Sequence, residues 1–258
     1  MQTYFYLIHF QYLGFRYHGW SKQPDLLTIE QMMEKTLGFI LGHCRFKILV
    51  ASRTDAKVSA RHCAFELFLR DPQDPEKLLT DLNLNLPGDI RILKIEEKDK
   101  NFNIINGPKI KEYLYLFSFG KKCHPFCAPL MSCFPYGLDI GLMQSGALLF
   151  KGTHHFIRYC TQPGSGTKFE REILESRITE NTLFTASFFP AESYVYIIRS
   201  KGFLRYQVRL IMGQLLSLGR GEISLEDIRE SLTGNDHRPL RHIAPASGLI
   251  LNKISFKT

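Results

Sequence analysis

The chain has 258 residues, enough for one large domain or two smaller ones with a buried interior. Hydrophobic residues make up 44% and charged residues 22%, close to the averages of soluble globular proteins, which excludes a disordered or fibrous chain. Lysine and arginine outnumber the acidic residues by 33 to 25, and the formal charge of +8 favours an anionic partner such as nucleic acid.

The first ten residues alternate aromatic and aliphatic side chains, without the basic flank and apolar core of a signal peptide. No stretch approaches the roughly 18 consecutive apolar residues of a membrane-spanning helix. We therefore expect a cytoplasmic protein without a membrane partner. Its six cysteines should stay reduced in that compartment.

The first hundred residues alternate strand and helix patterns. A capping pattern of Thr28 with Gln31 predicts a helix that ends near Gly42, and a second helical pattern is broken by Pro87-Gly88. The predicted elements are a strand at 4–12, the helix at 28–42, strands at 46–51 and 63–69, a helix at 75–86 and a strand at 90–95. This order predicts a split ferredoxin-like unit.

The second half repeats this pattern loosely. We predict strands at 110–119, 172–177, 183–189, 194–200 and 249–254, and helices at 138–150, from Phe203 onward and at 225–232. The predicted fold class is α+β, with two ferredoxin-like or RRM-like sub-domains whose largely antiparallel sheets share a core and a basic cleft. We expect the N-terminal sub-domain at 1–105 and the C-terminal one at 106–258.

A charged cluster lies between two of the predicted strands, with the sequence Ser52-Arg53-Thr54-Asp55-Ala56-Lys57-Val58. Loops held by a rigid scaffold often carry catalytic groups, which makes Asp55 a candidate. An ordinary Asx turn with a solvated Arg53 explains the same residues.

Two further clusters lie in the second half. Tyr113 and Tyr115 share one face of a predicted strand, where they fit either core packing or stacking on a flipped base. Arg205 and Arg209 lie four residues apart on a helix. Either a guanidinium is partly buried beside a carboxylate, or both side chains extend to solvent.

Taken in order, these clusters resemble the TruA-type tRNA pseudouridine synthases over nearly the whole chain. In the first half the matching motifs are Gly19-Trp20 with Gln23, Thr28-Ile29-Glu30-Gln31, Arg53-Thr54-Asp55-Ala56 and residues 83–90 (NLNLPGDI). In the second half they are Lys111-x-Tyr113-x-Tyr115, Gly152-Thr153-His154-His155-Phe156, Phe203-Leu204 with Val208-Arg209 and Gly213, and residues 244–249 (APASGL).

The resemblance implies an isomerase that converts uridine to pseudouridine in tRNA, without a cofactor or metal, with Asp55 as nucleophile. It further implies that Tyr113 stacks on the uracil and that Arg209 pairs with Asp55. Substrate-binding residues would be Arg53, Lys57, Tyr113 and Leu249. Such enzymes act as homodimers on the anticodon arm, at positions 38 to 40.

The sequence departs from the family pattern around the proposed nucleophile. Ser52 and Lys57 replace usual glycines, Ser59 replaces a usual histidine, and a usual arginine is lost near Ile105. His155 replaces a usual aspartate. We expect the lysine to forbid an easy positive φ. The departures leave open a pseudouridine synthase for another structured RNA, or a non-catalytic RNA-binding paralogue.

One cysteine and histidine cluster allows an alternative, a zinc site. Cys123, His124, Cys127 and Cys133 lie at short spacing, but structural zinc sites usually present paired C-x2-C knuckles. We therefore predict no metal at this cluster.

Overall fold

The computed structural model describes residues 2–43, 45–107 and 109–256. The chain forms two compact units. The N-terminal unit comprises residues 1–109 and 251–258, and the C-terminal unit comprises residues 110–250. No helix among the described residues has both the length and the apolar character needed to cross a bilayer.

The N-terminal unit has the predicted β-α-β-β-α-β order. Its elements are β1 (Tyr4–Tyr12), α1 (Ile29–Leu41), β2 (Lys47–Val50), β3 (Ser59–Leu69), α2 (Pro75–Asn85) and β4 (Ile90–Lys98). The strands lie in the order β4-β1-β3-β2, and each neighbouring pair is antiparallel. This arrangement confirms the ferredoxin-like prediction.

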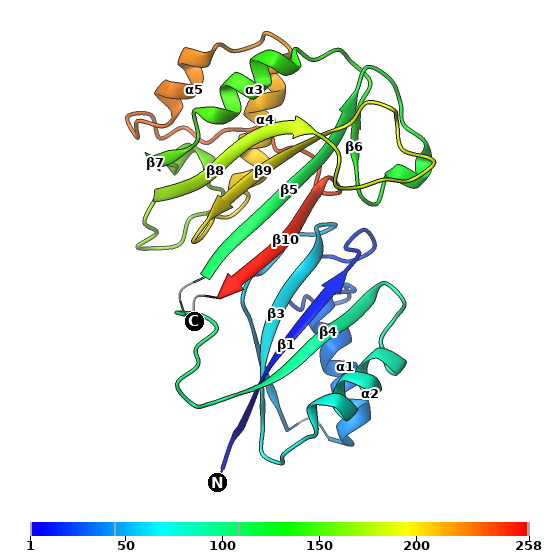
Figure 1. Cartoon of the computed structure of the whole chain (residues 1–258). Helices are drawn as coiled ribbons and strands as arrows, with labels where there is room; N and C mark the ends of the chain where they lie inside the picture. Colours follow the sequence, from blue (N-terminus) through cyan, green and yellow to red (C-terminus); the bar gives the residue numbers. More distant parts are fainter. Residues whose placement is uncertain (1, 44, 108, 257–258) are drawn as a thin grey trace. The chain divides into compact units, whose positions relative to one another are not determined.

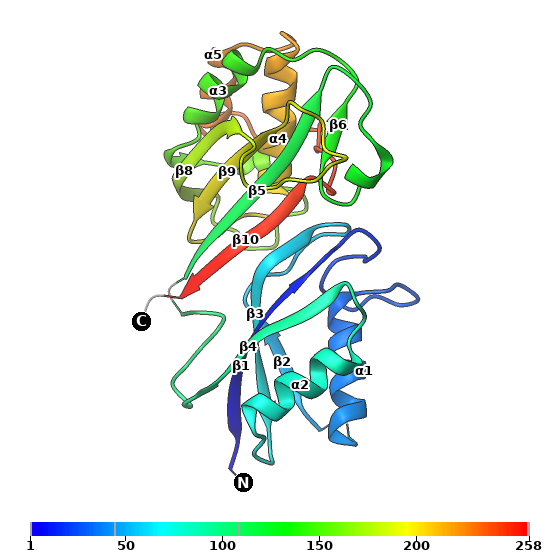
Figure 2. The ribbon, with the colours of Figure 1, turned by 45° about the vertical axis from the view of Figure 1, so that its right-hand side comes forward.

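Local sequence signals set the helix ends in this unit. Thr28 accepts a hydrogen bond from the Gln31 backbone, and Gly42 ends α1 in the left-handed conformation at φ 70°. Asp74 caps α2 through the backbone N–H groups of Glu76 and Lys77. Figures 1 and 2 show both helices on one face of the sheet.

A cluster of buried aromatic side chains packs on the sheet of this unit. The rings of Phe10, Trp20 and Phe65 pack with centroids 5.4–6.1 Å apart, and all three side chains are buried. Such a cluster gives the loops that connect the strands a rigid base.

The C-terminal unit is also α+β. Its strands are β5 (Lys109–Phe119), β6 (Ser132–Phe134), β7 (Gly152–His155), β8 (Glu170–Glu180), β9 (Tyr194–Ser200) and the start of β10 (Leu249–Phe256). Its helices are α3 (Ile140–Leu148), α4 (Gln207–Gly219) and α5 (Leu225–Ser231), with short 3-10 turns at Pro125–Cys127 and Ile157–Tyr159. Strands β5, β9, β8 and β7 follow one another in the sheet, and their pairing is antiparallel.

Both faces of the β5–β9 pair are buried, by different means. On one face Tyr196 hydrogen-bonds Ser176, which in turn donates to the α3 carbonyl of Ala147. Figure 1 shows α3, α4 and α5 together on this side. The other face carries an apolar cluster covered by two long connections; its buried members are Leu114, Leu116, Cys127, Met131, Val195, Ile197 and Ile250.

The predicted strand at 183–189 is wrong, because these residues form one of the covering connections. The Asn181 side chain accepts from the backbone of Leu183 and Phe184 and donates to the Phe184 carbonyl, which turns the chain out of the sheet. Phe184, Phe188 and Phe189 then pack on the apolar cluster. The aromatic pattern therefore reflects burial without strand pairing.

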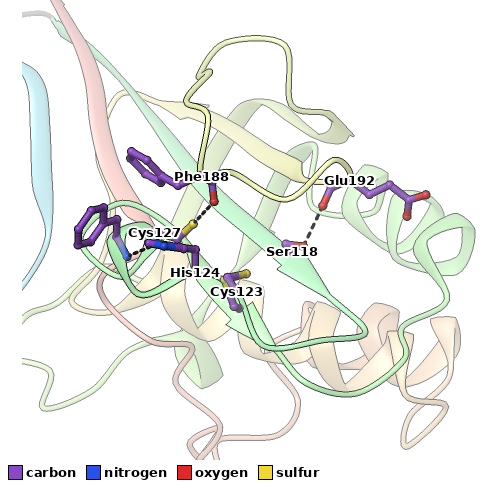
Figure 3. Close-up of a disulfide and its surroundings, with 8 residues drawn as sticks. Ser118, Cys123, His124, Cys127, Phe188 and Glu192 are labelled. Atoms are coloured by element: carbon purple, nitrogen blue, oxygen red, sulfur yellow. Dashed lines mark hydrogen bonds between the residues drawn. A yellow bond between two sulfur atoms is a disulfide. The ribbon is translucent and has the colours of Figure 1, made fainter.

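The second connection runs from the end of β5 to β6, at residues 120–131. A disulfide joins Cys123 in this connection to Cys133 in β6, and their Cα atoms are 5.9 Å apart. The expectation that all cysteines stay reduced is therefore wrong for this pair, because the connection folds back and brings the two side chains together. Nearby, the buried Cys127 thiol donates to the Phe188 carbonyl at 3.3 Å, which joins the two connections (Figure 3).

Candidate active site

The predicted catalytic loop, residues 52–58, connects β2 to β3 in the N-terminal unit. Arg53 and Lys57 are exposed, Asp55 is half-buried, and Ser52 and Val58 are buried at the two ends. The Val58 backbone donates to the Asp55 carbonyl at 3.2 Å, so the loop turns tightly at the proposed nucleophile. This places a carboxylate between two exposed cationic residues of one turn.

A second segment, residues 12–20, holds this loop through its backbone. The Trp20 N–H donates to the Thr54 carbonyl at 3.1 Å, and the Lys57 N–H donates to the Tyr17 carbonyl at 2.9 Å. The Tyr12 hydroxyl and the Thr54 hydroxyl are 2.7 Å apart. Asp55 is therefore flanked on both sides by residues fixed to the same segment.

Gly19 permits this close approach. Its φ is +88°, and a Cβ at this position would meet the Thr54 carbonyl oxygen at 2.5 Å. A side chain here would push the loop away. The structure thus explains why the Gly19-Trp20 motif and the Asp55 motif occur together.

Asp89, from the motif at residues 83–90, holds the 12–20 segment in place through Leu13, Arg16 and Tyr17. Its carboxylate accepts from the Tyr17 hydroxyl at 2.7 Å and from the Arg16 guanidinium, and its carbonyl accepts from the Leu13 N–H at 2.9 Å. Burial alone would raise the pKa of Asp89, but the hydrogen bonds from Arg16 and Tyr17 outweigh burial and hold it below its usual value.

Lys57 adopts a φ of +67°, which is the left-handed conformation. The expectation that a lysine would keep the loop out of this conformation is therefore wrong. A residue with a Cβ adopts it at a cost of about 1–2 kcal/mol, which the hydrogen bonds around the loop must offset.

In the C-terminal unit, Tyr113 lies on β5 opposite Ile198 of β9 and is 7% exposed. Its ring packs edge-on against Phe203, with centroids 5.3 Å apart. Most of the Tyr113 residue is therefore covered by its neighbours. Phe203 belongs to the segment before α4, because the helix starts at Gln207 rather than at Phe203 as predicted.

Arg209 lies in the first turn of α4 and is half-buried. Its Nε donates to the Ala244 carbonyl at 2.8 Å, and its guanidinium lies 5.0 Å from the centre of the Tyr206 ring. The Ala244 N–H donates back to the Arg209 carbonyl at 3.1 Å. Arg205, in contrast, is exposed. Of the two arginines, only Arg209 is fixed between its helix and the 244–249 segment in this way.

Leu249 is the buried last residue of the 244–249 segment, and its N–H donates to the Ala246 carbonyl at 3.0 Å. The Tyr115 hydroxyl donates to the Pro245 carbonyl at 2.8 Å, and the Gly248 carbonyl accepts from Leu116. Three of the four motifs of the second half therefore meet within this unit, around β5, the start of α4 and residues 244–249, whereas residues 152–155 form β7 at the far edge of its sheet.

The six predicted site residues thus form two groups, each inside one unit. Arg53, Asp55 and Lys57 share one loop; Tyr113, Arg209 and Leu249 lie on the elements of the C-terminal unit just described. Two further residues contact these groups and are not among the predicted site residues: Tyr12 contacts the loop from β1, and Tyr206 contacts Arg209. No sequence signal joins Tyr12 to Thr54, because 42 residues separate them.

Among residues 2–43, 45–107 and 109–256, no three His, Cys, Asp or Glu side chains gather as a metal site would require. The disulfide removes the thiolates of Cys123 and Cys133 as ligands.

Comparisons with known proteins agree with the motifs. The sequence model of a family described as tRNA pseudouridine synthase matches residues 147–257. The tRNA pseudouridine synthase A of Thermodesulfovibrio yellowstonii is 30% identical over 254 residues, covering 95% of this chain and 97% of its own length. The proteins of that name from Exiguobacterium sibiricum and Streptococcus thermophilus are also 30% identical, over 95% of this chain and 94% and 96% of their own lengths.

Proposed function

The chain belongs to the tRNA pseudouridine synthase A family, and from that premise we propose that Asp55 is the nucleophile with which it isomerises uridine in tRNA. The enzyme is an isomerase that forms pseudouridine. The proposed target is a uridine of the anticodon arm, at positions 38 to 40.

The reaction rearranges one nucleotide without adding or removing atoms overall. Asp55 attacks the uridine at the base or at the ribose anomeric carbon, and the bond between N1 and that carbon breaks. The base turns, C5 bonds to the anomeric carbon, the C5 proton leaves, N1 gains a proton, and Asp55 is released. Covalent catalysis and confinement of the detached base can therefore suffice.

The remaining roles follow from the family resemblance. Tyr113 stacks on the target uracil and takes part in removing the C5 proton. Arg209 supplies the positive charge that keeps Asp55 ionised. Arg53, Lys57 and Leu249 bind the nucleotide and its phosphates. A uridine in a stem must leave the base stack to meet these groups.

The observation that carries the proposal is the loop around Asp55. Hydrogen bonds fix the residues on both sides of it, Thr54 and Lys57, while Asp55 itself is only partly buried and lies two residues from the exposed Arg53. A nucleophile needs this combination of fixed position and access. An Asx turn with a purely structural role does not require Asp55 to remain accessible.

The first prediction concerns Asp55→Asn, which keeps the size of the side chain and removes its nucleophilic oxygen. Pseudouridine formation in a tRNA transcript should fall by at least about 10³-fold, while tRNA affinity stays within about threefold. Single-turnover assays and filter binding measure the two quantities. Asp71→Asn, at an exposed turn of the same unit, is the control and should stay fully active. Normal turnover by Asp55→Asn would contradict the role of Asp55.

Mapping pseudouridine in RNA from cells with and without the gene tests the target. Loss at positions 38 to 40 supports the anticodon arm. Loss elsewhere supports the alternative of another structured RNA, which the loop with Ser52, Lys57 and Ser59 would accommodate as readily as tRNA.

We also propose a homodimer that works in the cytoplasm, where tRNA is modified. The Cys123–Cys133 disulfide would be an exception to the usual reduced state of cysteines in that compartment. Sedimentation of the purified chain tests the dimer.

A further inference from the structure

Lys57 combines a strained backbone with an exposed side chain. Its φ of +67° lies in the region that favours glycine, and its side chain contributes nothing to a buried core. Strain of this kind persists when the surrounding structure over-determines it, and it clusters at ligand contacts. The side chain is therefore the feature of Lys57 that needs an explanation.

The Lys57 ammonium lies over the ring of Phe15, with Nζ 5.9 Å from the ring centre. Phe15 is 39% exposed, whereas Phe10 and Phe65, which pack in the aromatic cluster of the same unit, are fully buried. A cation–π contact at this distance and exposure is weak. It leaves both groups available to a ligand.

The position of this pair links it to the proposed nucleophile. Phe15 lies in the 12–20 segment that fixes the loop. The Lys57 N–H donates to the carbonyl of Tyr17, which is two residues after Phe15. Lys57 itself is two residues from Asp55. The exposed ring and the ammonium therefore lie on the same backbone framework as the Asp55 carboxylate.

We propose that Phe15 and Lys57 bind the nucleotide adjacent to the target uridine: Phe15 stacks on its base and Lys57 binds its phosphate. This inference rests on the proposed function and adds a specificity-determining contact to it. An aromatic face accepts any base, and a lysine ammonium binds a phosphate as a point charge. When the base stacks on Phe15, the Lys57 ammonium moves from the ring to the phosphate. This movement breaks only the weak cation–π contact.

The structural alternative is that Lys57 and Phe15 only stabilise the turn. In that case Lys57→Gly removes the cation–π contact together with the left-handed strain, and RNA binding stays unchanged. Under our proposal this variant has a melting temperature equal to wild type or about 2–4 °C higher, and binds RNA more weakly. A more stable protein with weaker binding distinguishes a functional side chain from a structural one.

The experiment compares Phe15→Leu and Lys57→Gly with matched controls in α1. Phe39→Leu removes a ring that is 75% exposed, and Lys35→Gln removes an exposed charge. Equilibrium binding of substrate tRNA is measured at several salt concentrations, and kcat is measured separately from KM. Melting temperatures of all variants establish that they fold.

We expect Phe15→Leu to weaken tRNA binding by about 5- to 100-fold without changing its salt dependence. Lys57→Gly should lower the slope of log affinity against log salt by about 0.7–0.9, as expected for one lost phosphate contact. For both variants the loss should appear in tRNA affinity and in KM, because both groups are proposed to bind a flanking nucleotide rather than the reacting uridine. The controls in α1 should bind like wild type.

A substrate with one abasic nucleotide beside the target uridine sharpens the test. The wild type should bind this tRNA more weakly when the abasic nucleotide lies on one side of the target uridine, and normally when it lies on the other side. On the weakly bound substrate, Phe15→Leu should cause little further loss of affinity. Unchanged affinity in both variants, or equal further loss with the abasic RNA, overturns the inference. Failure of wild type to form pseudouridine would instead overturn the proposed function, so the two failures are distinguishable.

Discussion

The two groups of site residues are held by different kinds of interaction. The loop around Asp55 is fixed mainly through its backbone, by the Trp20 and Lys57 N–H groups and the Thr54 and Tyr17 carbonyls. The Tyr113 and Arg209 group is fixed by packed side chains and by close contact between α4 and the 244–249 segment. Both arrangements restrict motion, but they depend on different features of the sequence.

This difference determines which substitutions each group tolerates. A loop fixed by backbone hydrogen bonds accepts new side chains while its path is kept, as Lys57 in the left-handed conformation illustrates. A packed group has no room for added atoms, because protein interiors are close-packed. We therefore expect substitutions in the Asp55 loop to change mainly the function of the side chain. Substitutions in the Tyr113 and Arg209 group should mainly lower the stability of the fold.

The largest effect is expected from Gly213→Ala in α4. A Cβ on Gly213 would overlap the His242 carbonyl, so α4 and the segment before Ala244 would have to separate. We expect a loss of about 3 kcal/mol in the free energy of unfolding, from overpacking against backbone. Urea unfolding monitored by circular dichroism measures it.

Gly137→Ala is the matched control, since a Cβ there would meet no atom within 4 Å. It should change the free energy of unfolding by less than about 0.5 kcal/mol. Equal stability of the two variants would show that α4 and the segment before Ala244 are not closely packed, and the contrast between the two groups would fail.

Local patterns in the sequence predicted much of the fold. Thr28 and Gly42 mark the ends of α1 because capping depends on neighbouring residues alone. The strand at 183–189 was predicted wrongly because its phenylalanines pack on an apolar face made by distant strands. The left-handed φ of Lys57 and the contact between Tyr12 and Thr54 depend on segment 12–20, which no local pattern connects to the loop.

An intermediate effect is expected from Tyr12→Phe, which removes one side-chain hydrogen bond to the Asp55 loop. The cost should be about 1 kcal/mol in stability. Because the backbone hydrogen bonds of the loop remain, kcat should fall several-fold while KM stays nearly constant. Steady-state kinetics on a tRNA transcript measures both.

Tyr6→Phe is the control for this variant, since it removes a hydroxyl from the same strand that donates to the Gln73 carbonyl and accepts from the Gln73 N–H. It should lower stability by at least as much and leave kcat unchanged. A kcat as high as wild type in Tyr12→Phe would show that the backbone hydrogen bonds alone position the loop.

The smallest effect is expected from the charge of Asp89, which anchors the 12–20 segment. Its pKa is below the usual value in the folded protein, so its contribution to stability is present above the unfolded pKa of about 3.9 and is lost as the pH falls through the folded pKa. Asp89→Asn should therefore melt below wild type at pH 7 and approach it as the pH falls below the unfolded pKa and through the lower folded pKa. Arg16 is half-exposed, so added salt should also reduce the difference. A difference that is independent of both pH and salt would mean that shape and neutral hydrogen bonds, rather than the carboxylate charge, hold this segment against the loop.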